Sequence, residues 1–143
     1  MKKKIKLHKA IIKYNKNGNI IKIINKDIFN KDWKFGELYL SNVKFNILKG
    51  WHYHKKQTSC LFVLNGKVKF VTYDQVNNKF KSFILDGASN IKKSIIIYPK
   101  TWYAFQGLGF KDNFILNLSN SLHSKKYSIK KNIEKFNYRW SNN

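Results

Sequence analysis

Two histidines spaced two residues apart are the most chemically suggestive feature of the sequence. His52 and His54 lie in the segment KGWHYHKKQ, residues 49–57. If this segment is a β-strand, side chains at positions i and i+2 project from the same face. Two imidazoles on an inward face could ligate a metal or provide a general base near neutral pH. A hydrogen-bonded core histidine is the alternative, but the flanking Gly50 and aromatic residues favour a functional pair.

A second segment with candidate chemistry is IIIYPKTWYAFQGLG, residues 95–109. A buried strand leads into Pro99, and an aromatic strand follows it. Alternation places Trp102 on one face of this strand and Tyr103, with Phe105, on the other. Trp102 could pack in the core or contact a ligand. A buried phenol needs a polar partner, so we expect Tyr103 in the wall of a pocket.

A carboxylate stands out in the segment FGELYLS, residues 35–41, because the chain contains only two glutamates. One of them is Glu37. It could lie exposed on an edge strand, or it could face the pocket. In so basic a protein, a carboxylate in a pocket would find partners easily.

Most of the chain that must position these residues reads as short strands separated by turns. Asn65-Gly66, between two apolar runs, is the clearest hairpin signal, because both residues tolerate positive φ. Short strands with little helical periodicity predict an all-β antiparallel sandwich or barrel. Only residues 125–135 could form a short helix. The expected strands are 5–14, 19–24, 37–48, 58–64, 67–73, 79–85, 94–98 and 113–118.

Length and composition indicate a single globular domain. The chain has 143 residues, of which 43% are hydrophobic, enough to bury one core and to exclude a disordered tail. Cys60 is the only cysteine, so the fold has no disulfide framework. No apolar run approaches the roughly 20 residues of a membrane span, and no signal peptide is recognisable. We therefore expect a cytoplasmic protein that does not enter the membrane.

The net charge is +22, from 29 basic and 7 acidic residues, and it points to anionic partners. Every basic residue except Arg139 is a lysine, which is typical of the codon bias of an AT-rich genome. That bias does not explain the scarcity of acids. The lysines are spread along the chain, and no RRM-like, zinc-module or helix-turn-helix pattern stands out. These observations disfavour nucleic acid as the partner.

Six short motifs, taken in order, resemble one group of proteins. The group is the sugar-nucleotide cupins related to dTDP-4-dehydrorhamnose 3,5-epimerase, and in particular its short epimerase-like members. The resemblance covers about residues 35–140. The motifs are FGELYLS (35–41), KGWHYHKK (49–56), YD (73–74), PKTWYAFQG (99–107), NLSNSLH (117–123) and YRW (138–140).

The resemblance implies the fold and its organisation. It implies an all-β cupin, a double-stranded β-helix jelly roll with a short helical or irregular C-terminal segment. Residues 1–143 would form one cupin domain. In it, strands within 1–34 could form a dimer, 35–120 would be the jelly-roll core, and 121–143 the C-terminal segment. Family members are commonly homodimers, in which N-terminal strands complete the neighbour's sheet.

No cofactor is expected from the resemblance. Gly50, His52, His54 and Gly66 match the first cupin motif. The position of the metal-binding glutamate holds Ser59, and the third histidine would fall at Tyr103 or Ala104. With two of the four usual ligands missing, we expect no metal site.

The resemblance also implies the reaction. Enzymes of this family remove a proton next to the keto group of a dTDP-linked 4-keto-6-deoxy sugar and return it on the other face. His52 matches the family's base, and Glu134 is the one acid of the C-terminal segment that could partner it. The family's oxyanion lysine is replaced here by Ser59, and its acid tyrosine by Leu116 or Asn117. Three residues could substitute for them: His54, Tyr103 and Asn117.

Substrate binding is assigned by the same resemblance. Lys49 stands where the family uses an arginine to hold the diphosphate, and Lys55 is on the same segment. Lysine keeps the charge but loses the bidentate fork. The remaining substrate-binding candidates are Glu37, Ser59 and Trp102.

Three functions remain open at this stage. The first is an epimerase or isomerase in the biosynthesis of surface polysaccharide such as lipopolysaccharide. The second is a sugar 3,4-ketoisomerase, suggested by the HYHKKQ segment, residues 52–57. The third is a cupin that binds nucleotide-sugars or glycans without catalysis.

Overall fold

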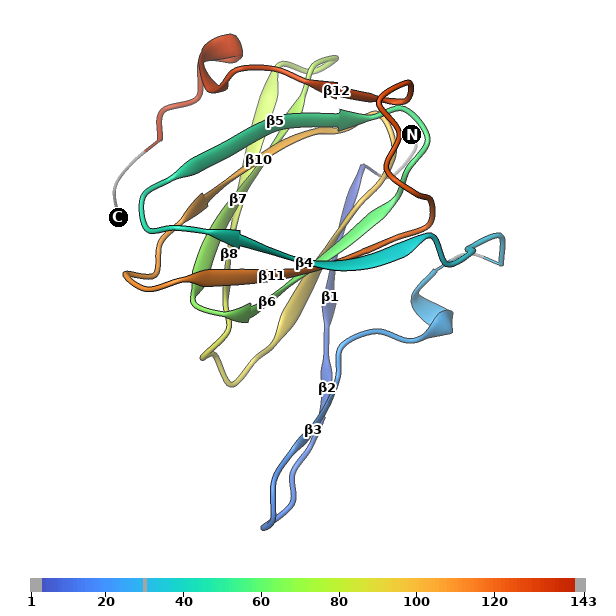
Figure 1. The fold of residues 1–143 in the computed structure, drawn as a ribbon, viewed down its shortest axis with the longest axis vertical. Helices are drawn as coiled ribbons and strands as arrows, with labels where there is room; N and C mark the ends of the chain where they lie inside the picture. Colours follow the sequence, from blue (N-terminus) through green and yellow to red (C-terminus); the bar gives the residue numbers. More distant parts are fainter. Residues whose placement is uncertain (1–3, 30, 141–143) are drawn as a thin grey trace.

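The computed structural model describes residues 4–29 and 31–140, which form two facing five-stranded antiparallel sheets (Figure 1). The first sheet runs in the order β1-β9-β6-β11-β4, with the bounds Ile5–Lys9, Lys93–Ile97, Ser59–Asn65, Asn113–Ser119 and Glu37–Val43. The second runs β12-β5-β10-β7-β8, with the bounds Ser128–Lys130, Leu48–His54, Trp102–Gly107, Lys67–Asp74 and Lys79–Asp86. From β4 to β11 the chain passes repeatedly from one sheet to the other, staying in one sheet only for the β7–β8 hairpin. The predicted all-β cupin jelly roll is confirmed.

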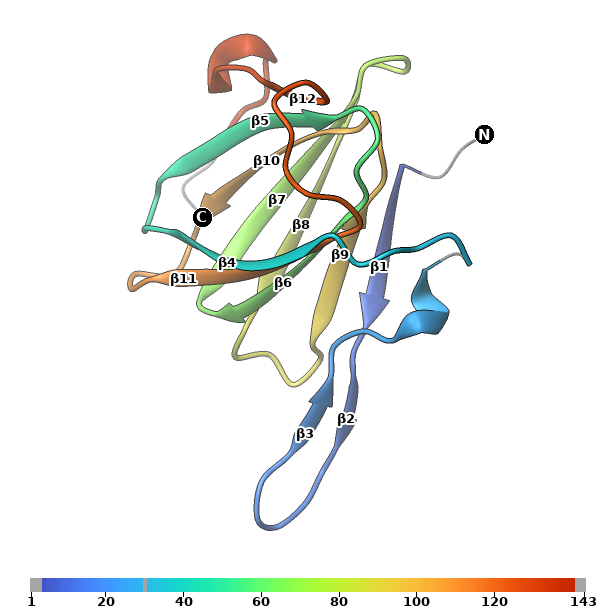
Figure 2. The same cartoon turned by 45° about the vertical axis from the view of Figure 1, so that its right-hand side comes forward.

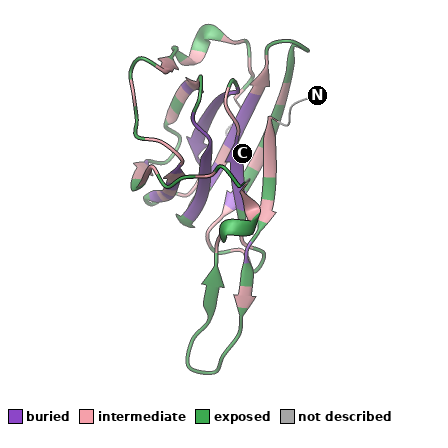
Figure 3. Cartoon of the chain, turned by 90° about the vertical axis from the view of Figure 1, so that its right-hand side faces the viewer, coloured by how far each residue is buried: buried purple, intermediate pink, exposed green. Residues whose placement is uncertain are grey.

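The main core lies between the two sheets and consists of alternate residues from each strand. Leu61 and Val63 on β6 face Phe70 on β7 across this space. Figure 3 shows the buried stretches concentrated in the central strands. Burying a side chain of this size contributes about 1.5–3 kcal/mol, so this layer holds the sheets together. Its other buried members are Val43, Val68, Leu85, Ile95, Ile97, Tyr103, Phe105 and Ile115.

The turn predicted at Asn65-Gly66 joins β6 to β7. Gly66 has φ +82°, and a Cβ atom there would lie 2.3 Å from Oδ1 of Asn113. That oxygen accepts hydrogen bonds from the backbone N–H groups of Lys67 and Gly109, at 2.8 and 3.0 Å. Asn113 therefore ties the hairpin to the β10–β11 connection, and glycine is the residue that leaves room for it.

A second apolar layer covers the outer face of the second sheet. Trp51 and Trp102 form its base, and the C-terminal segment lays Phe136 and Trp140 over them. The indole N–H of Trp51 donates to the carbonyl oxygen of Ile133 at 3.0 Å. The jelly roll therefore buries aromatic side chains on an outer face as well as between its sheets.

Residues 125–135, which could form a short helix by their sequence, do not form one. The segment instead contains β12, which pairs with β5, and a short 3-10 turn at Ile133–Lys135. The physical reason is the open edge of β5, whose backbone groups need partners. Ser128-Ile129-Lys130 supplies them and turns Ile129 into the outer aromatic layer.

The N-terminal segment begins in the first sheet and then leaves it. β1 pairs with β9, after which β2 (Ile11–Lys13) and β3 (Ile20–Lys22) form a hairpin that projects from the barrel (Figures 1 and 2). A 3-10 turn, Lys26–Ile28, precedes β4. The two 3-10 turns are the only helical elements in the described residues, and neither is long enough to cross a membrane.

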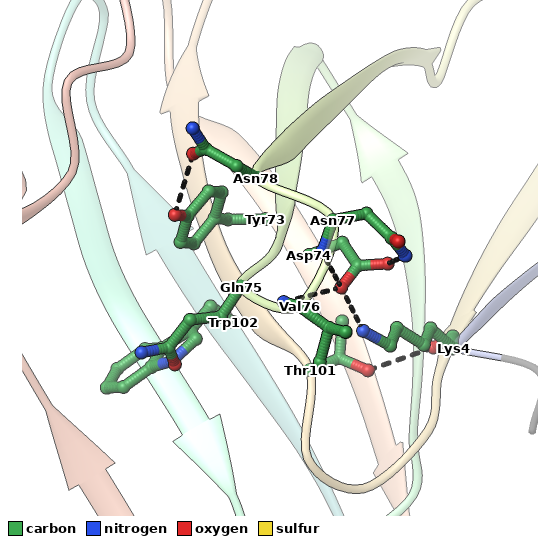
Figure 4. A network of polar contacts seen from close by, with 9 residues as sticks. All are labelled: Lys4, Tyr73, Asp74, Gln75, Val76, Asn77, Asn78, Thr101 and Trp102. Carbon is green, nitrogen blue, oxygen red and sulfur yellow. Dashed lines mark hydrogen bonds and ion pairs between the residues drawn. The ribbon is translucent and has the colours of Figure 1, made fainter.

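A polar network fastens the start of the chain to the second sheet (Figure 4). Lys4 forms an ion pair with Asp74 at the end of β7. The carbonyl oxygen of Lys4 accepts a hydrogen bond from the Thr101 hydroxyl at 3.2 Å. Asp74 also accepts from the backbone N–H of Val76 at 3.0 Å. Hydrogen bonds from Lys4 and Asn77 hold the pKa of Asp74 well below its usual range.

Candidate active site

His52 and His54 both point into the space between the sheets, as the alternation of β5 predicts. Their neighbours Trp51 and Tyr53 point the other way, into the outer aromatic layer. The ring of His52 lies 5.3 Å from the ring of Tyr103, between centroids. The candidate site is therefore built on two adjacent strands, β5 and β10.

His54 is held from both sides. Its Nδ1 lies 2.9 Å from the hydroxyl of Ser128, and its Nε2 lies 3.2 Å from the hydroxyl of Tyr103. Ser128 comes from β12, in register opposite His54. One imidazole thus joins the hydroxyl groups of two strands that flank β5.

Burial and positive charge keep both imidazoles neutral at pH 7. Burial, followed by the charge of Lys130 and smaller contributions from nearby groups, lowers the pKa of His52 to about 4. Burial and the charge of His123 lower the pKa of His54. Burial raises the pKa of Tyr103, and the Tyr39 phenol adds to this shift. The site therefore combines two bases able to accept a proton with a phenol that keeps one.

The facing wall of the site comes from β4, β6 and β11 and is polar. Glu37, Tyr39 and Ser41 share one face of β4 with Val43, a residue of the main core. Burial and the charge of Glu37 raise the pKa of Tyr39. Tyr39 is therefore a second protonated phenol, on the sheet opposite the histidines.

Asn117 is buried in this wall, and its side-chain amide is hydrogen-bonded within the wall. Its amide donates to the hydroxyl of Ser41 at 3.1 Å and to the carbonyl oxygen of Ile115 at 2.8 Å. Ser59 is also buried, and its hydroxyl accepts from the amide of Gln57 at 2.9 Å. These contacts hold both side chains in the wall.

Glu37 holds the loop that places His123 beside His54. A carboxylate oxygen of Glu37 accepts a hydrogen bond from the backbone N–H of His123 at 3.0 Å. This bond holds the connection after β11 beside the histidines, so that the His123 ring lies 6.3 Å from that of His54. Glu37 therefore acts on the site indirectly, by fixing the loop that carries His123.

Four lysines on β5, β12 and the loop after β5 form what we call the lysine rim: Lys49, Lys55, Lys56 and Lys130. The ammonium group of Lys49 donates to the carbonyl oxygen of Asn42 on β4 at 2.5 Å. Lys49 and Lys130 both contribute to the lowered pKa of His52. The ammonium group of Lys56 lies 4.4 Å from the centre of the Tyr127 ring. Lys55 is exposed and joins this rim through its backbone N–H, which donates to the carbonyl oxygen of Tyr127 at 2.8 Å. A small cavity of 250 Å³ lies beside the rim, lined by Lys56, Gln57, Ser121, Leu122, Ser124, Tyr127 and Ser128.

Two residues singled out in the sequence lie apart from the histidines. Trp102 faces the outer aromatic layer, where its ring lies 4.8 Å from that of Tyr53 and its N–H donates to Gln75 at 3.3 Å. Glu134 is exposed in the last 3-10 turn and lines an open hollow with Lys130 and Lys131. Neither touches His52.

Three residues that lie near the histidines were not predicted from the sequence as parts of the site: Ser128, Lys130 and His123. For the first two a signal exists, because Ser128-Ile129-Lys130 alternates polar and apolar residues as a half-buried strand does. Within residues 4–29 and 31–140, no group of three or more histidine, cysteine or acidic side chains is arranged to hold a metal ion.

Fold and site together define a cupin with paired neutral histidines and phenols between its two sheets. A family model described as "FdtA: WxcM-like, C-terminal" matches residues 3–139, and the chain belongs to this family. No curated protein matches the chain in sequence.

Solved structures share the fold at low sequence identity. A dTDP sugar isomerase from Desulfovibrio desulfuricans superposes with a TM-score of 0.83 at 20% identity, covering 95% of this chain and 90% of the other. A double mutant of ChmJ, a 3'-monoepimerase from Streptomyces bikiniensis, in complex with dTDP gives 0.83 at 12% identity, with 96% and 74% covered. QdtA, a sugar 3,4-ketoisomerase from Thermoanaerobacterium thermosaccharolyticum in complex with TDP, gives 0.75 at 23% identity, with 95% and 93% covered.

Proposed function

We propose that this protein is an isomerase that moves a proton next to the keto group of a dTDP-linked 4-keto-6-deoxy sugar. The observation that carries the proposal is the pair of neutral imidazoles beside a protonated phenol in the space between the two sheets. The similarity in fold to a dTDP sugar isomerase, a monoepimerase and a ketoisomerase supports the class of substrate.

His52 is the proposed base. A C–H bond next to a carbonyl loses its proton when a base accepts it while a donor stabilises the negative oxygen. His52 is neutral at pH 7 and lies beside Tyr103, whose phenol retains its proton. The imidazole of His52 takes the proton from carbon, and the Tyr103 hydroxyl donates to the oxygen.

The placement of the phenols favours a ketoisomerisation as the second candidate. Tyr103 lies on the same sheet as His52, so donor and base approach the sugar from one side. This arrangement suits an enediol in which the carbonyl shifts to the neighbouring carbon. Epimerisation needs an acid on the opposite face, and Tyr39 on β4 is the phenol placed to supply it.

The diphosphate is assigned to the lysine rim. Lys49 and Lys130 place positive charge near His52, and Lys55 adds charge just beyond the end of β5. Lysines act as point charges, so they favour an anion without fixing its orientation as an arginine fork would. We propose that Glu37 and Ser59 shape the sugar-binding site through their hydrogen bonds to His123 and Gln57.

A location in the cytoplasm and a role in surface-polysaccharide synthesis are part of the same proposal. Cys60 is buried and forms no disulfide, which fits a reducing compartment.

We also propose that the protein is a homodimer. The outer face of the first sheet exposes Leu38 and Leu40, at 54% and 52% of their surface. Beside them lies an apolar hollow of 380 Å³, lined by Ile21 of the N-terminal segment and by Leu116 and Leu118 of β11. A two-stranded hairpin such as β2–β3 is marginal alone, and Figure 3 shows it almost entirely exposed. A second copy of the chain, seated on this face, would cover both features.

The experiment that tests the function is product analysis by NMR. The protein is incubated with dTDP-4-keto-6-deoxyglucose in deuterated water. We expect either a shifted keto group or deuterium at the carbon next to it, and Tyr39→Phe should abolish epimerisation but spare a keto shift. Tight binding of dTDP with no change in any keto-sugar would instead establish a non-catalytic binding protein.

A further inference from the structure

β12 brings one hydroxyl group to the candidate site from a segment far away in sequence. Ser128 pairs in register with His54, and Ile129 turns to the opposite face, into the outer aromatic layer. The Ser128 side chain therefore faces the histidines, with its oxygen 2.9 Å from Nδ1 of His54. Ser128 also lines the 250 Å³ cavity next to the rim, so it lies between His54 and that cavity.

The contacts of His54 allow two arrangements of hydrogen. A neutral imidazole carries a proton on one nitrogen and accepts at the other. In the first arrangement Nδ1–H donates to Ser128, and the Tyr103 hydroxyl donates to Nε2. In the second, the Ser128 hydroxyl donates to Nδ1, and Nε2–H donates to the Tyr103 oxygen. Only in the second arrangement is the proton of Tyr103 directed away from His54 and available to a substrate.

We propose that Ser128, His54 and Tyr103 form a proton relay, in which Ser128 positions His54 and Tyr103 exchanges the proton with the sugar. This inference rests on the proposed function. Tyr103 donates its proton to the keto oxygen while His52 takes the proton from the neighbouring carbon. The Nε2 proton then passes to Tyr103, the Ser128 proton passes to Nδ1, and Ser128 takes a proton from solvent water in the cavity. The relay ends in its first arrangement.

The second half of the reaction restores the relay. His52 returns its proton to the former keto carbon, and the neighbouring hydroxyl of the enediol loses its proton to Tyr103. The Tyr103 proton moves to Nε2, the Nδ1 proton moves to Ser128, and Ser128 releases one proton to solvent. Each turnover thus takes one proton from water and returns one. A carbonyl shift needs one proton given to the old oxygen and one taken from the new one, so donation and uptake balance.

The backbone holds β12 in place without the Ser128 hydroxyl. The N–H of Trp51 donates to the carbonyl oxygen of Lys131 at 2.6 Å, and the N–H of Lys131 donates to that of Trp51 at 2.9 Å. On the other side, the N–H of Lys55 donates to the carbonyl oxygen of Tyr127 at 2.8 Å. Removing the hydroxyl should therefore leave the strand paired, which makes Ser128 a testable positioning residue.

The test compares Ser128→Ala and Ser128→Thr with wild type in the full chain. The matched control is Ser124→Ala, since Ser124 lines the same cavity. The readouts are kcat and KM for dTDP-4-keto-6-deoxyglucose and the ¹⁵N resonances of the His54 ring without substrate, assigned with His54→Gln. Losing one hydrogen bond in the relay should lower kcat by about tenfold. We expect KM to stay close to the wild-type value and Ser128→Thr to restore kcat.

The NMR measurement of the His54 ring does not depend on turnover of a substrate. The Nδ1 resonance of His54 should move in Ser128→Ala, return in Ser128→Thr and stay unchanged in Ser124→Ala. An unmoved Nδ1 resonance, or an active Ser128→Ala with wild-type kcat, would overturn the relay while leaving the proposed function intact. A wild-type protein that turns over no keto-sugar would overturn the proposed function, and the relay's role with it.

Discussion

His52 is neutral because its surroundings penalise a positive charge. Burial is the largest cause of the lowering of its pKa to about 4. The positive charges of nearby groups lower it further: Lys130, His54, Lys49 and His123. A free imidazole would titrate at about 6.5 and lose half of its basic form there. The site therefore gains a base that works under mildly acidic conditions.

The pH dependence of activity follows from this shift. Because the pKa of His52 is lowered, the basic form persists as pH falls below 6.5 and is lost only near pH 4. We expect the acid limb of a plot of kcat/KM against pH to lie near pH 4, with the protein still folded by circular dichroism. An acid limb at pH 6.5 would contradict the buried, neutral state of His52.

The sequence predicted the inward pair on β5 and the position of Tyr103, because both follow from strand alternation. It did not predict the contact between His54 and Ser128, which joins residues 74 positions apart. Such a contact depends on which distant strand pairs with the edge of β5, and local patterns carry little information on that. The same limit applies to Trp102, which could pack in the core or contact a ligand, and to Glu134, which the resemblance offered as the partner of His52. The facing of both side chains depends on the fold, which local patterns do not give.

The C-terminal segment acts as a structural element through its aromatic side chains. The Phe136 ring lies 4.4 Å from that of Tyr73, 5.2 Å from that of Trp102 and 5.3 Å from that of Trp51. These contacts hold the segment against the second sheet and so keep β12 beside β5. The sequence showed the aromatic residues but left open whether the segment was helical or irregular, since pairing with a distant strand edge was not visible.

Removing the Phe136 ring tests this element. We expect Phe136→Ala to lower the free energy of unfolding by about 2 kcal/mol, less than a fully buried phenylalanine would, since the ring is half-buried. The measurement is urea unfolding followed by tryptophan fluorescence. Phe110→Ala is the control, because that ring is 88% exposed and should cost little. Equal stability of the two variants would show that the outer layer does not hold the segment.

The whole molecule carries a large positive charge that few acids offset. The ion pairs of the described residues are Lys4–Asp74 and Lys67–Asp86. The fold uses part of the remaining charge at the lysine rim, where Lys49 and Lys130 lie near His52. The sequence showed the excess of lysine but not this placement, because the rim is assembled from separate strands. The scarcity of acidic residues has no explanation in the structure.

Self-association belongs to the molecule as a whole and can be measured directly. We expect a dimer by sedimentation at micromolar concentration, because the outer face of the first sheet exposes several leucines. Leu38→Glu with Leu116→Glu should give monomers, since two carboxylates would be placed on the covered face. The control is Val76→Glu, an 86% exposed residue on the β7–β8 turn. A wild-type monomer would contradict the proposed interface.

The most direct test of the proposed chemistry is solvent deuterium exchange that depends on His52. Wild type, His52→Gln and the control His8→Gln, on β1 outside the site, are incubated with dTDP-4-keto-6-deoxyglucose in deuterated water and followed by proton NMR. We expect wild type and His8→Gln to transform the sugar, with deuterium entering next to the keto group. His52→Gln should slow this by at least about a hundredfold, the usual contribution of a general base. Exchange at the wild-type rate in His52→Gln, with the fold intact, would contradict the assignment of His52 as the base.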